Sequence, residues 1–177
     1  MDRLYFAPLA SPFGRIWALK TEKGLVRLIL PPTTAGKFDP GPSQLASWRD
    51  NYEPGYRLME SPSRLKDLEQ WLKRYLEDGD PQQNIPLDLR GTPFQKKVWA
   101  IVKDIPYGHT VTYGSISVKL SKKSTSSRAV GSAVGANPVP LIVPCHRVIG
   151  ENGKLVGFRS GLKMKQDLLR REGVLLL

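Results

Sequence analysis

The stretch that decides the fold is Asn137-Pro-Val-Pro-Leu-Ile-Val-Pro-Cys-His-Arg-Val148, which contains the only cysteine of the chain, Cys145. Its apolar run, residues 139–143, is bounded by prolines, so we predict a buried extended segment that ends at the cysteine. His146 and Arg147 follow directly and bring a base and a cation near the thiol. Such neighbours favour the nucleophilic thiolate. The stretch therefore predicts a reactive cysteine in a pocket, against the commoner role of a single cysteine as a small buried hydrophobic residue.

On an extended chain, the side chain of His146 would not reach the sulfur of Cys145. Neighbouring side chains of an extended chain point to opposite faces, so His146 reaches the sulfur only if the chain turns there or a water bridges them. A third group would have to orient the histidine, as in other pairs of nucleophile and base. The only other histidine is His109.

The composition is that of a folded protein of one domain, or of two small ones. The chain has 177 residues, of which 40% are hydrophobic and 24% charged, enough for a sizeable core. No apolar run approaches the roughly 18 residues that span a bilayer, and the N-terminus has no signal pattern. One cysteine cannot form an internal disulfide, nor a structural zinc site with two histidines. The simplest interpretation is an intracellular protein without metal or cofactor.

The formal net charge of +11 is distributed unevenly. Residues 1–90 hold 13 Lys and Arg against 12 Asp and Glu, whereas residues 91–177 hold 14 against 4. This asymmetry indicates a polyanionic partner, with nucleic acid ahead of an anionic membrane surface. A general solubilising charge is the alternative, and charge alone does not decide between them.

The first 80 residues predict a small structural α/β domain with an antiparallel sheet and a helix. Alternating apolar residues predict strands at 4–7, 15–19 and 25–30, and residues 31–43 predict a loop. Apolar residues at helical spacing predict an amphipathic helix over 63–77. Residues 81–91, with two Pro and two Gln, predict a linker, followed by a second domain over 92–177.

The sequence of the second domain predicts a helix-turn-helix. Thr92-Pro93-Phe94-Gln95 is typical of a capped helix start. Two short helices over 115–120 and 126–135 flank a polar, basic turn, as in DNA-binding helix pairs. The second of them is rich in small residues, which allows either close approach to another surface or tight packing on a neighbouring helix. Residues 149–156 predict a hairpin turning at Asn152-Gly153, and residues 162–172 predict a last helix.

The pentapeptide Pro144-Cys145-His146-Arg147-Val148 resembles the active-site signature of the O6-alkylguanine-DNA alkyltransferases. The resemblance covers about residues 91–174, while the N-terminal part fits only the general plan of strands and helix. It keeps the family's order and approximate spacing at Phe94–Trp99, Ile105–Gly108, Val111–Gly114, Arg128–Gly131, Ala136–Pro138 and Leu168–Gly173.

The resemblance implies an α+β fold, with an N-terminal α/β domain and a C-terminal helix-turn-helix domain of winged-helix type that carries the cysteine. It implies DNA repair by irreversible, stoichiometric transfer of an alkyl group from O6-alkylguanine, and from O4-alkylthymine, to Cys145. The damaged nucleotide would first leave the duplex, because a stacked guanine cannot present its O6 atom to a buried thiol.

The same resemblance implies the setting of the reaction. The protein would be a single-turnover methyltransferase without metal or cofactor. It would bind double-stranded DNA through the minor groove as a monomer, with cooperative binding along DNA as an option, and it would not bind membranes. It would act in the cytoplasm, or in the nucleus if the source is eukaryotic.

The family's catalytic roles carry over by position. His146 would take the thiol proton through a water, and Glu172 would hydrogen-bond His146 and stabilise its charged form. Asn137 would shape the turn between the recognition helix and the active-site strand. Backbone carbonyls at Cys145 and Val148 would accept the guanine amino group.

The roles in DNA and base binding carry over in the same way. Tyr113 would press on the target phosphate and hydrogen-bond the flipped base, and Arg128 would fill the hole that the base leaves in the duplex. Flat and charged, an arginine side chain can stack and stay ionised. The remaining DNA contacts implied are Ser126, Ser127, Ala129, Gly131 and Arg147.

The sequence departs from relatives in the loop that lines the substrate pocket. Relatives often have Tyr-Arg-Trp-Gly or Tyr-Ser-Gly-Gly there, whereas this chain has Phe158-Arg159-Ser160-Gly161. Phe158 and Arg159 would still contact the substrate, but the missing tyrosine hydroxyl leaves the preferred size of alkyl group open. The turn over 121–127 is also longer or more basic than in some relatives, and the N-terminal zinc ligands of some members are absent.

Three other functions are weighed against repair. A damage-binding protein that recognises lesions for another pathway replaces the cysteine, so Cys145 argues against it. A winged-helix regulator would use Cys145 as a buried or redox-sensing thiol and would bind a specific operator as a dimer. A cysteine hydrolase is less favoured because no distant histidine or asparagine arrangement is apparent beyond His109.

Overall fold

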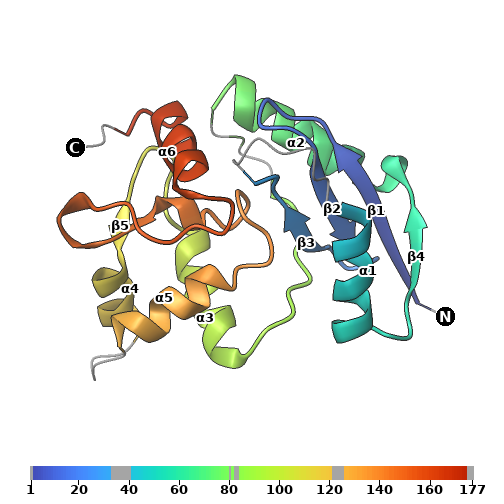
Figure 1. The fold of residues 1–177 in the computed structure, drawn as a ribbon, viewed down its shortest axis with the longest axis horizontal. Coiled ribbons are helices and arrows are strands. Elements are labelled where there is room, and N and C mark those ends of the chain that lie inside the picture. The colour runs from blue at the N-terminus through green and yellow to red at the C-terminus, as the bar shows by residue number, and fades with distance from the viewer. Residues whose placement is uncertain (1, 33–40, 80, 82–83, 121–125, 175–177) are drawn as a thin grey trace. The chain divides into compact units, whose positions relative to one another are not determined.

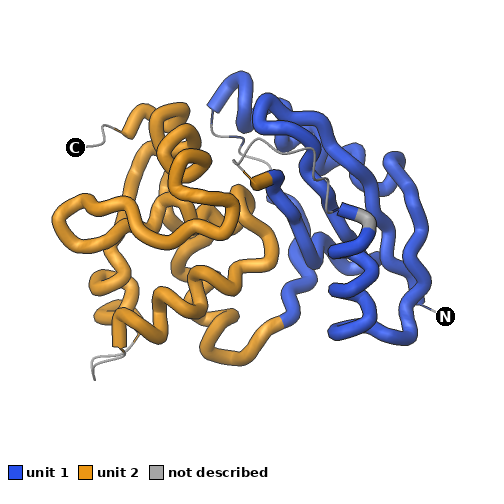
Figure 2. The backbone as a smooth tube through the Cα atoms, viewed as in Figure 1, with its two compact units in different colours: residues 1–31, 35–90 blue, residues 32–34, 91–177 orange. Residues whose placement is uncertain are grey.

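The computed structural model describes residues 2–32, 41–79, 81, 84–120 and 126–174 (Figure 1). The chain forms two compact units, residues 1–31 with 35–90 and residues 32–34 with 91–177 (Figure 2). Both units mix helices and strands, which confirms the predicted α+β class. Among the described residues, no helix is long and apolar enough to cross a membrane.

Unit 1 is built on a four-stranded sheet in the order β3-β2-β1-β4. The predicted strands form β1 (Arg3–Leu9), β2 (Ile16–Lys20) and β3 (Leu25–Ile29), and β2 is antiparallel to both β1 and β3. The fourth strand, β4 (Arg57–Glu60), pairs parallel with β1, so the sheet is mixed and the antiparallel prediction was incomplete. The parallel pairing follows from α1 (Gly41–Tyr52), which carries the chain across between β3 and β4.

Helices cover this sheet. The core cluster joins Leu45 and Trp48 of α1 to apolar side chains of the first three strands. A single 3₁₀ turn, η1 (Pro62–Leu65), leads into α2 (Lys66–Glu77), which confirms the predicted helix over 63–77. Burial of four consecutive residues of β2 agrees with Figure 1, where α1 and α2 lie on opposite sides of the sheet.

The described residues of the predicted linker, up to Arg90, are part of unit 1. Residue 85 is buried, and the backbone of residues 86–88 exchanges hydrogen bonds with Leu25 at 2.8 and 2.9 Å. Gly24 is required here, because a Cβ at this position would lie 2.6 Å from the Pro86 carbonyl oxygen. Arg90 then forms ion pairs with Glu53 and Asp88.

Unit 2 is a helical cluster with one small sheet. Its helices are α3 (Pro93–Lys103), α4 (Tyr113–Leu120), α5 (Ser127–Gly135) and α6 (Leu162–Arg171). The predicted capping box at Thr92 and Gln95 is formed, and α3, α4 and α5 pack against one another. The indole of Trp99 donates to the carbonyl of Ala133 at 2.8 Å and so fixes α3 to α5. The basic turn predicted at 121–125 lies outside the described residues.

Two predictions near the cysteine were wrong in detail. The run over 139–143 is not extended throughout, because Pro140 to Val143 form a turn with Leu141 at a φ of 74°. The turn predicted at Asn152-Gly153 is present, with φ values of 58° and 76°. However, β6 (Val148–Ile149) pairs parallel with β5 (Val111–Thr112), and the described residues after the turn form no second hairpin strand.

Candidate active site

Cys145 begins a single 3₁₀ turn, η2 (Cys145–Arg147), at the end of the turn described above. Its amide donates to the carbonyl of Val143 at 2.8 Å, and the amide of Val148 closes the turn on the Cys145 carbonyl. The side chain is 8% exposed, so the sulfur lies just beneath the surface. Because the chain turns here, the side chains of Cys145 and His146 need not point to opposite faces as they would in a strand.

Asn137 braces this turn from the end of α5. Its amide nitrogen donates to the Val143 carbonyl at 2.7 Å, and its amide oxygen accepts from the Val139 amide at 3.0 Å. Both bonds are buried, and Asn137 is 7% exposed. Buried amide groups left without partners would be costly, so these bonds define the path of the chain into Cys145.

His146 and Glu172 are brought together although they are far apart in sequence. Nε2 of His146 lies 2.6 Å from Oε1 of Glu172, and both side chains are completely buried. Glu172 caps the end of α6, so packing of α6 on η2 delivers the carboxylate. A carboxylate on Nε2 keeps the proton of the neutral ring at that nitrogen and leaves Nδ1 as the basic atom.

Arg147, predicted as a DNA contact, is buried and binds inside the site instead. Its Nε donates to Oε2 of Glu172 at 2.8 Å and its Nη2 to Oε1 at 3.0 Å, a bidentate pair. Its Nη1 donates to the carbonyl of Ile105 at 2.6 Å. With three donors committed at 7% exposure, the guanidinium is not available to a DNA phosphate in this structure.

The segment from Ile105 to His109 closes around Glu172. The amide of Gly108 donates to Oε2 of Glu172 at 3.3 Å, and the hydroxyl of Tyr107 donates to the carbonyl of Arg171 at 3.0 Å. Gly108 has a φ of 73°, a left-handed conformation that favours glycine. His109 is exposed, and its Nδ1 lies 3.0 Å from the Tyr107 carbonyl oxygen, so the structure does not bring it to the cysteine.

Burial determines the protonation states of Cys145 and His146. It raises the pKa of the Cys145 thiol, while hydrogen bonding by Asn137 and the charges of Lys165 and Arg159 act in the opposite direction. Burial lowers the pKa of His146, and the Glu172 carboxylate opposes that change. At neutral pH the arrangement therefore pairs a thiol with a neutral imidazole, which can accept the thiol proton as the sulfur attacks.

The residues predicted to hold the base belong to α4 and to the loop before α6. Tyr113 begins α4, and its hydroxyl donates to the Val156 carbonyl at 3.3 Å. Burial and the nearby Cys145 raise the pKa of this tyrosine. Phe158 and Arg159 lie in the following loop, where Arg159 donates to the carbonyl at the end of α5, that of Gly135, at 3.5 Å.

Sequence reasoning missed Lys165. Its side chain is 0% exposed, and Nζ donates to the carbonyls of Val148 and Val156 at 2.6 and 2.8 Å. In the sequence it is one of several basic residues on a polar helix and carries no distinguishing signal. It follows Met164 directly and lies three residues before Leu168, which could only have suggested a helix face near the core.

The second helix of the pair presents its small residues outward. Ser126, Ser127, Arg128 and Ala129 are exposed, whereas Val130, Ala133 and Val134 face the interior. The side chain of Ser126 caps the helix on the Arg128 amide at 3.2 Å. A Cβ at Gly135 would meet nothing within 4 Å, and one at Gly131 would meet only the Tyr113 ring at 3.8 Å. Internal packing therefore does not demand glycine at these two positions.

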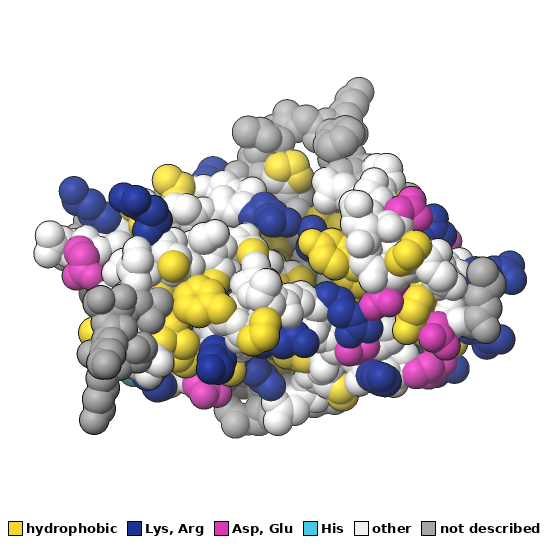
Figure 3. Space-filling view, turned by 90° about the horizontal axis from the view of Figure 1, so that it is seen from below, with side chains coloured by type: hydrophobic (Ala, Val, Ile, Leu, Met, Phe, Trp, Pro, Cys, Tyr) yellow, Lys and Arg dark blue, Asp and Glu magenta, His cyan; other side chains and the backbone are white. Residues whose placement is uncertain are grey.

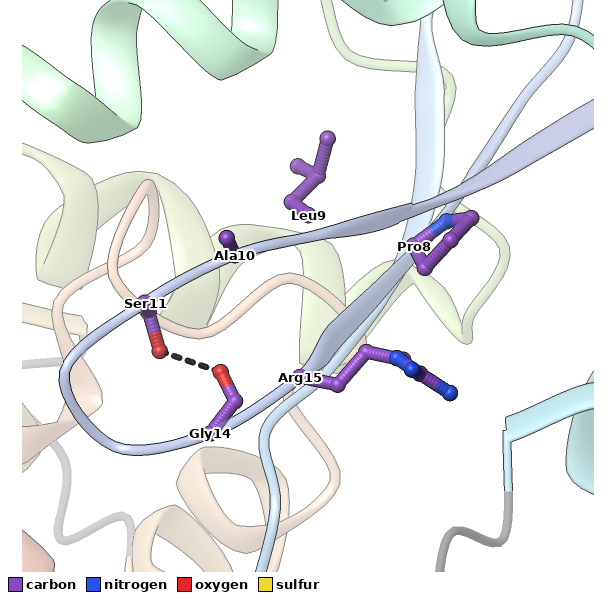
Figure 4. A pocket seen from close by; sticks show the side chains of 6 residues that line it. All are labelled: Pro8, Leu9, Ala10, Ser11, Gly14 and Arg15. Atoms are coloured by element: carbon purple, nitrogen blue, oxygen red, sulfur yellow. Dashed lines mark hydrogen bonds between the residues drawn. The ribbon is translucent and has the colours of Figure 1, made fainter.

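The charge of the surface follows the composition. On the face in Figure 3, most acidic side chains lie over unit 1, while Lys and Arg lie over both units. A cavity of about 420 Å³ occurs at the turn between β1 and β2 of unit 1, lined by Pro8, Leu9, Ala10, Ser11, Gly14 and Arg15 (Figure 4). Arg15 is the one titratable group among these described lining residues, so they offer none of the chemistry found around Cys145. The described residues contain no group of three or more His, Cys, Asp or Glu that could hold a metal.

Comparison with known proteins singles out the same unit. Residues 93–174 match a family model described as 6-O-methylguanine DNA methyltransferase, DNA binding domain. The chain is 37% identical over 169 residues to an inducible methylated-DNA–protein-cysteine methyltransferase of Bacillus subtilis, covering 96% of this chain and 90% of the relative. It is 40% identical over 173 residues to a methylated-DNA–protein-cysteine methyltransferase of Methanosarcina acetivorans, with 96% and 99% covered.

The fold is also that of a solved complex. A crystal structure of the Mycobacterium tuberculosis protein OGT bound to DNA superposes with a TM-score of 0.72 at 30% identity. The superposition covers 95% of this chain and 92% of the mycobacterial chain, so both units belong to the shared fold.

Proposed function

The chain belongs to the methylated-DNA–protein-cysteine methyltransferases, which repair DNA by direct alkyl transfer, and we propose that it transfers the group to Cys145 from a nucleotide swung out of the duplex. The resemblance seen in the sequence over residues 91–174 is thereby confirmed. The single observation that carries the assignment of roles is the buried Glu172 carboxylate, which binds both His146 and Arg147, the two residues after Cys145.

The proposed reaction is an attack of sulfur on the alkyl carbon. As the bond between Cys145 Sγ and that carbon forms, the bond from the carbon to guanine O6 breaks and its electron pair stays on the guanine. The thiol proton passes through a water to Nδ1 of His146, and Glu172 stabilises the resulting imidazolium. The guanine anion then takes up one proton from water and the imidazolium gives one back, so the products are guanine, a neutral thioether and a neutral His146.

The thioether explains a single turnover. A thioether has no proton to give up and no leaving group of comparable ability, so the sulfur cannot be regenerated by His146. The protein is consumed in a one-to-one ratio with the lesion.

Base flipping is proposed from the position of the sulfur. Cys145 lies beneath the surface of unit 2, and the O6 atom of a stacked guanine cannot reach it. Flipping costs a few kcal/mol, less for a badly paired lesion, and a side chain that fills the gap offsets part of this. Arg128, exposed near the start of α5, is proposed for that task, and Tyr113 and the carbonyl of Val148 are proposed to hold the extruded base.

The exposed face of α5 is proposed to enter the minor groove. Ser126, Ser127, Ala129 and Gly131 have small side chains, which allow the backbone close to the groove floor. The basic excess of residues 91–177 supplies phosphate contacts that do not depend on sequence and weaken as salt rises.

Several finer points are proposed with this function. Residues 92–177 carry DNA binding and transfer, residues 1–80 form a structural domain, and 81–91 connect them. O4-alkylthymine is a second substrate, and the protein acts as a monomer, with cooperative binding along DNA as an option. The place of action is the cytoplasm, or the nucleus in a eukaryotic source.

Intact-mass measurement tests the proposal. After mixing with duplex DNA that carries one O6-methylguanine, we expect the protein to gain one methyl group in place of one hydrogen, on the peptide that contains Cys145. The amount of methylated protein should equal the amount of lesion removed, and it should not increase further with time. Several lesions repaired per protein molecule, or methylation of another residue, would exclude the mechanism.

The matched control separates binding from transfer. Cys145→Ala removes only the sulfur, so we expect no mass gain but undiminished affinity for the same DNA. A variant that still removes the methyl group would show that a different residue is the acceptor.

A further inference from the structure

Lys165 lies inside unit 2 in a position that packing alone does not explain. Its side chain is 0% exposed, and lysine is almost never fully buried unless its charge is compensated. Nζ donates to three carbonyls, those of Val148 at 2.6 Å, Val156 at 2.8 Å and Gly157 at 3.5 Å, which uses all three donors of an ammonium group. An apolar side chain of similar length would fill the same space without desolvating a charge.

The three carbonyls belong to the walls proposed to hold the base. The carbonyl of Val148 is the proposed acceptor for the guanine amino group. The carbonyl of Val156 also accepts from the Tyr113 hydroxyl at 3.3 Å, and Gly157 precedes the loop of residues 158–161. Lys165 thus joins β6, the start of α4 and this loop at one point.

The ammonium is also coupled to the nucleophile. The amide of Val148, whose carbonyl binds Lys165, donates to the carbonyl of Cys145. The charge of Lys165 lowers the pKa of Cys145, and Cys145 in turn raises the pKa of Lys165. Arg159 acts on the sulfur in the same direction, and the charge of Lys165 lowers the pKa of His146, which favours the neutral base.

Lys165 is charged at neutral pH despite its burial. Desolvation lowers its pKa from an ordinary value of 10.5 to about 8. At pH 7 the group is still an ammonium, and it becomes neutral as the pH rises through 8. The charge can therefore be removed in the wild-type protein by pH alone, as well as by substitution.

We propose that Lys165 is a positioning residue of the transfer reaction, whose ammonium stabilises the negative charge that develops on the Cys145 sulfur while it holds the carbonyls of Val148 and Val156 in place. This inference rests on the proposed function. It predicts that loss of the charge, and not only loss of the side chain, slows alkylation of the sulfur.

The test uses iodoacetamide on the full-length protein without DNA, because the chain has one cysteine and the label reports on it alone. At pH 7 we expect Lys165→Met to react roughly tenfold more slowly than wild type, the effect of losing one nearby opposite charge. Above about pH 9 the two rates should converge, since wild-type Lys165 is then neutral. Lys163→Met, on the same helix with a 72% exposed side chain, should match wild type at every pH.

The pH dependence distinguishes this role from a structural one. A rate difference that is absent at pH 7, or that stays constant from pH 7 to 10, overturns the proposal. If Lys165→Met does not fold, as judged by circular dichroism, Lys165→Arg serves instead. Arginine keeps its charge above pH 8, so the ratio of wild-type rate to variant rate should fall between pH 7 and 10, and a constant ratio overturns the proposal.

Methyl transfer from O6-methylguanine DNA is measured on the same samples. If the wild type transfers the methyl group, but its iodoacetamide rate differs from that of the variant by the same factor at every pH, the role of Lys165 is rejected. The proposed function then stays intact. Absence of transfer by the wild type rejects the proposed function itself.

Discussion

Replacing Glu172 by glutamine should cost the protein a large part of its stability. In the wild type, Oε1 accepts from His146 Nε2 and Arg147 Nη2, and Oε2 accepts from Arg147 Nε and the Gly108 amide. The amide of a glutamine must place its NH₂ group where one of these oxygens lies. Whichever way it turns, two donors lose their acceptor and face another donor.

The magnitude follows from the charge that is left behind. Arg147 is 7% exposed and would remain in the interior without its carboxylate. Removing one partner of a buried ion pair costs about 3–5 kcal/mol, against a total free energy of unfolding of about 5–15 kcal/mol for a typical domain. We therefore expect Glu172→Gln to fold at low temperature and to unfold at a much lower denaturant concentration than wild type.

Urea denaturation in a double-mutant cycle isolates this effect. Arg147→Met should also destabilise the protein, because it leaves the carboxylate buried. The double variant Glu172→Gln/Arg147→Met should be more stable than the sum of the single effects predicts, by about 1–3 kcal/mol. Glu151→Gln, an exposed position in the same unit, is the control and should change the free energy of unfolding by less than about 0.5 kcal/mol. Additive single effects, or a cost below about 1 kcal/mol for Glu172→Gln, would refute the argument that Glu172 compensates Arg147.

Three further predictions concern other parts of the site. Because burial lowers the pKa of His146, the unfolded chain binds a proton first, so the free energy of unfolding should fall as the pH drops below about 6.5, by up to about 1.4 kcal/mol per pH unit relative to His146→Asn in urea titrations. Asn137→Ala leaves the Val143 carbonyl and the Val139 amide buried without their partner, so thermal melts should show a loss of roughly 2–4 kcal/mol, and a loss below about 1 kcal/mol would contradict this. Arg128→Ala should slow methyl transfer from duplex DNA at least tenfold and transfer from single-stranded DNA much less, and equal slowing on both substrates would count against the finger role.

Much of the fold could be predicted because local signals agreed with the tertiary structure. The capping box at Thr92 and the amphipathic pattern over residues 63–77 marked helices that the structure contains. The elements that were missed have weak local signals. Helix α1 has little amphipathic character, and its first three residues fall in the segment 31–43 that Pro and Gly marked as a loop. Strand β4 has only four residues, and its place beside β1 is set by the chain crossing between them.

The site residues likewise divide into those with a local signal in the sequence and those without one. Cys145 and His146 are adjacent, and a nucleophile beside a base is visible in any sequence. The pairing of His146 with Glu172 spans 26 residues, and it came from the family resemblance, not from the pattern. The environment of Arg147 could not be predicted from the sequence, because an arginine in a basic half looks like a DNA contact until its burial is known.

Lys165 gains an anionic neighbour only while the reaction takes place. Arg147 and Glu172 form an ion pair at all times, whereas no carboxylate in the described part of the chain forms an ion pair with Lys165. While Cys145 is a thiol, and again once it is a thioether, the ammonium is held by carbonyl dipoles alone. Its anionic partner exists only as the sulfur gives up its proton and attacks the alkyl carbon. An interaction that is strongest in the transition state accelerates the reaction, which gives the desolvation of Lys165 a catalytic reason.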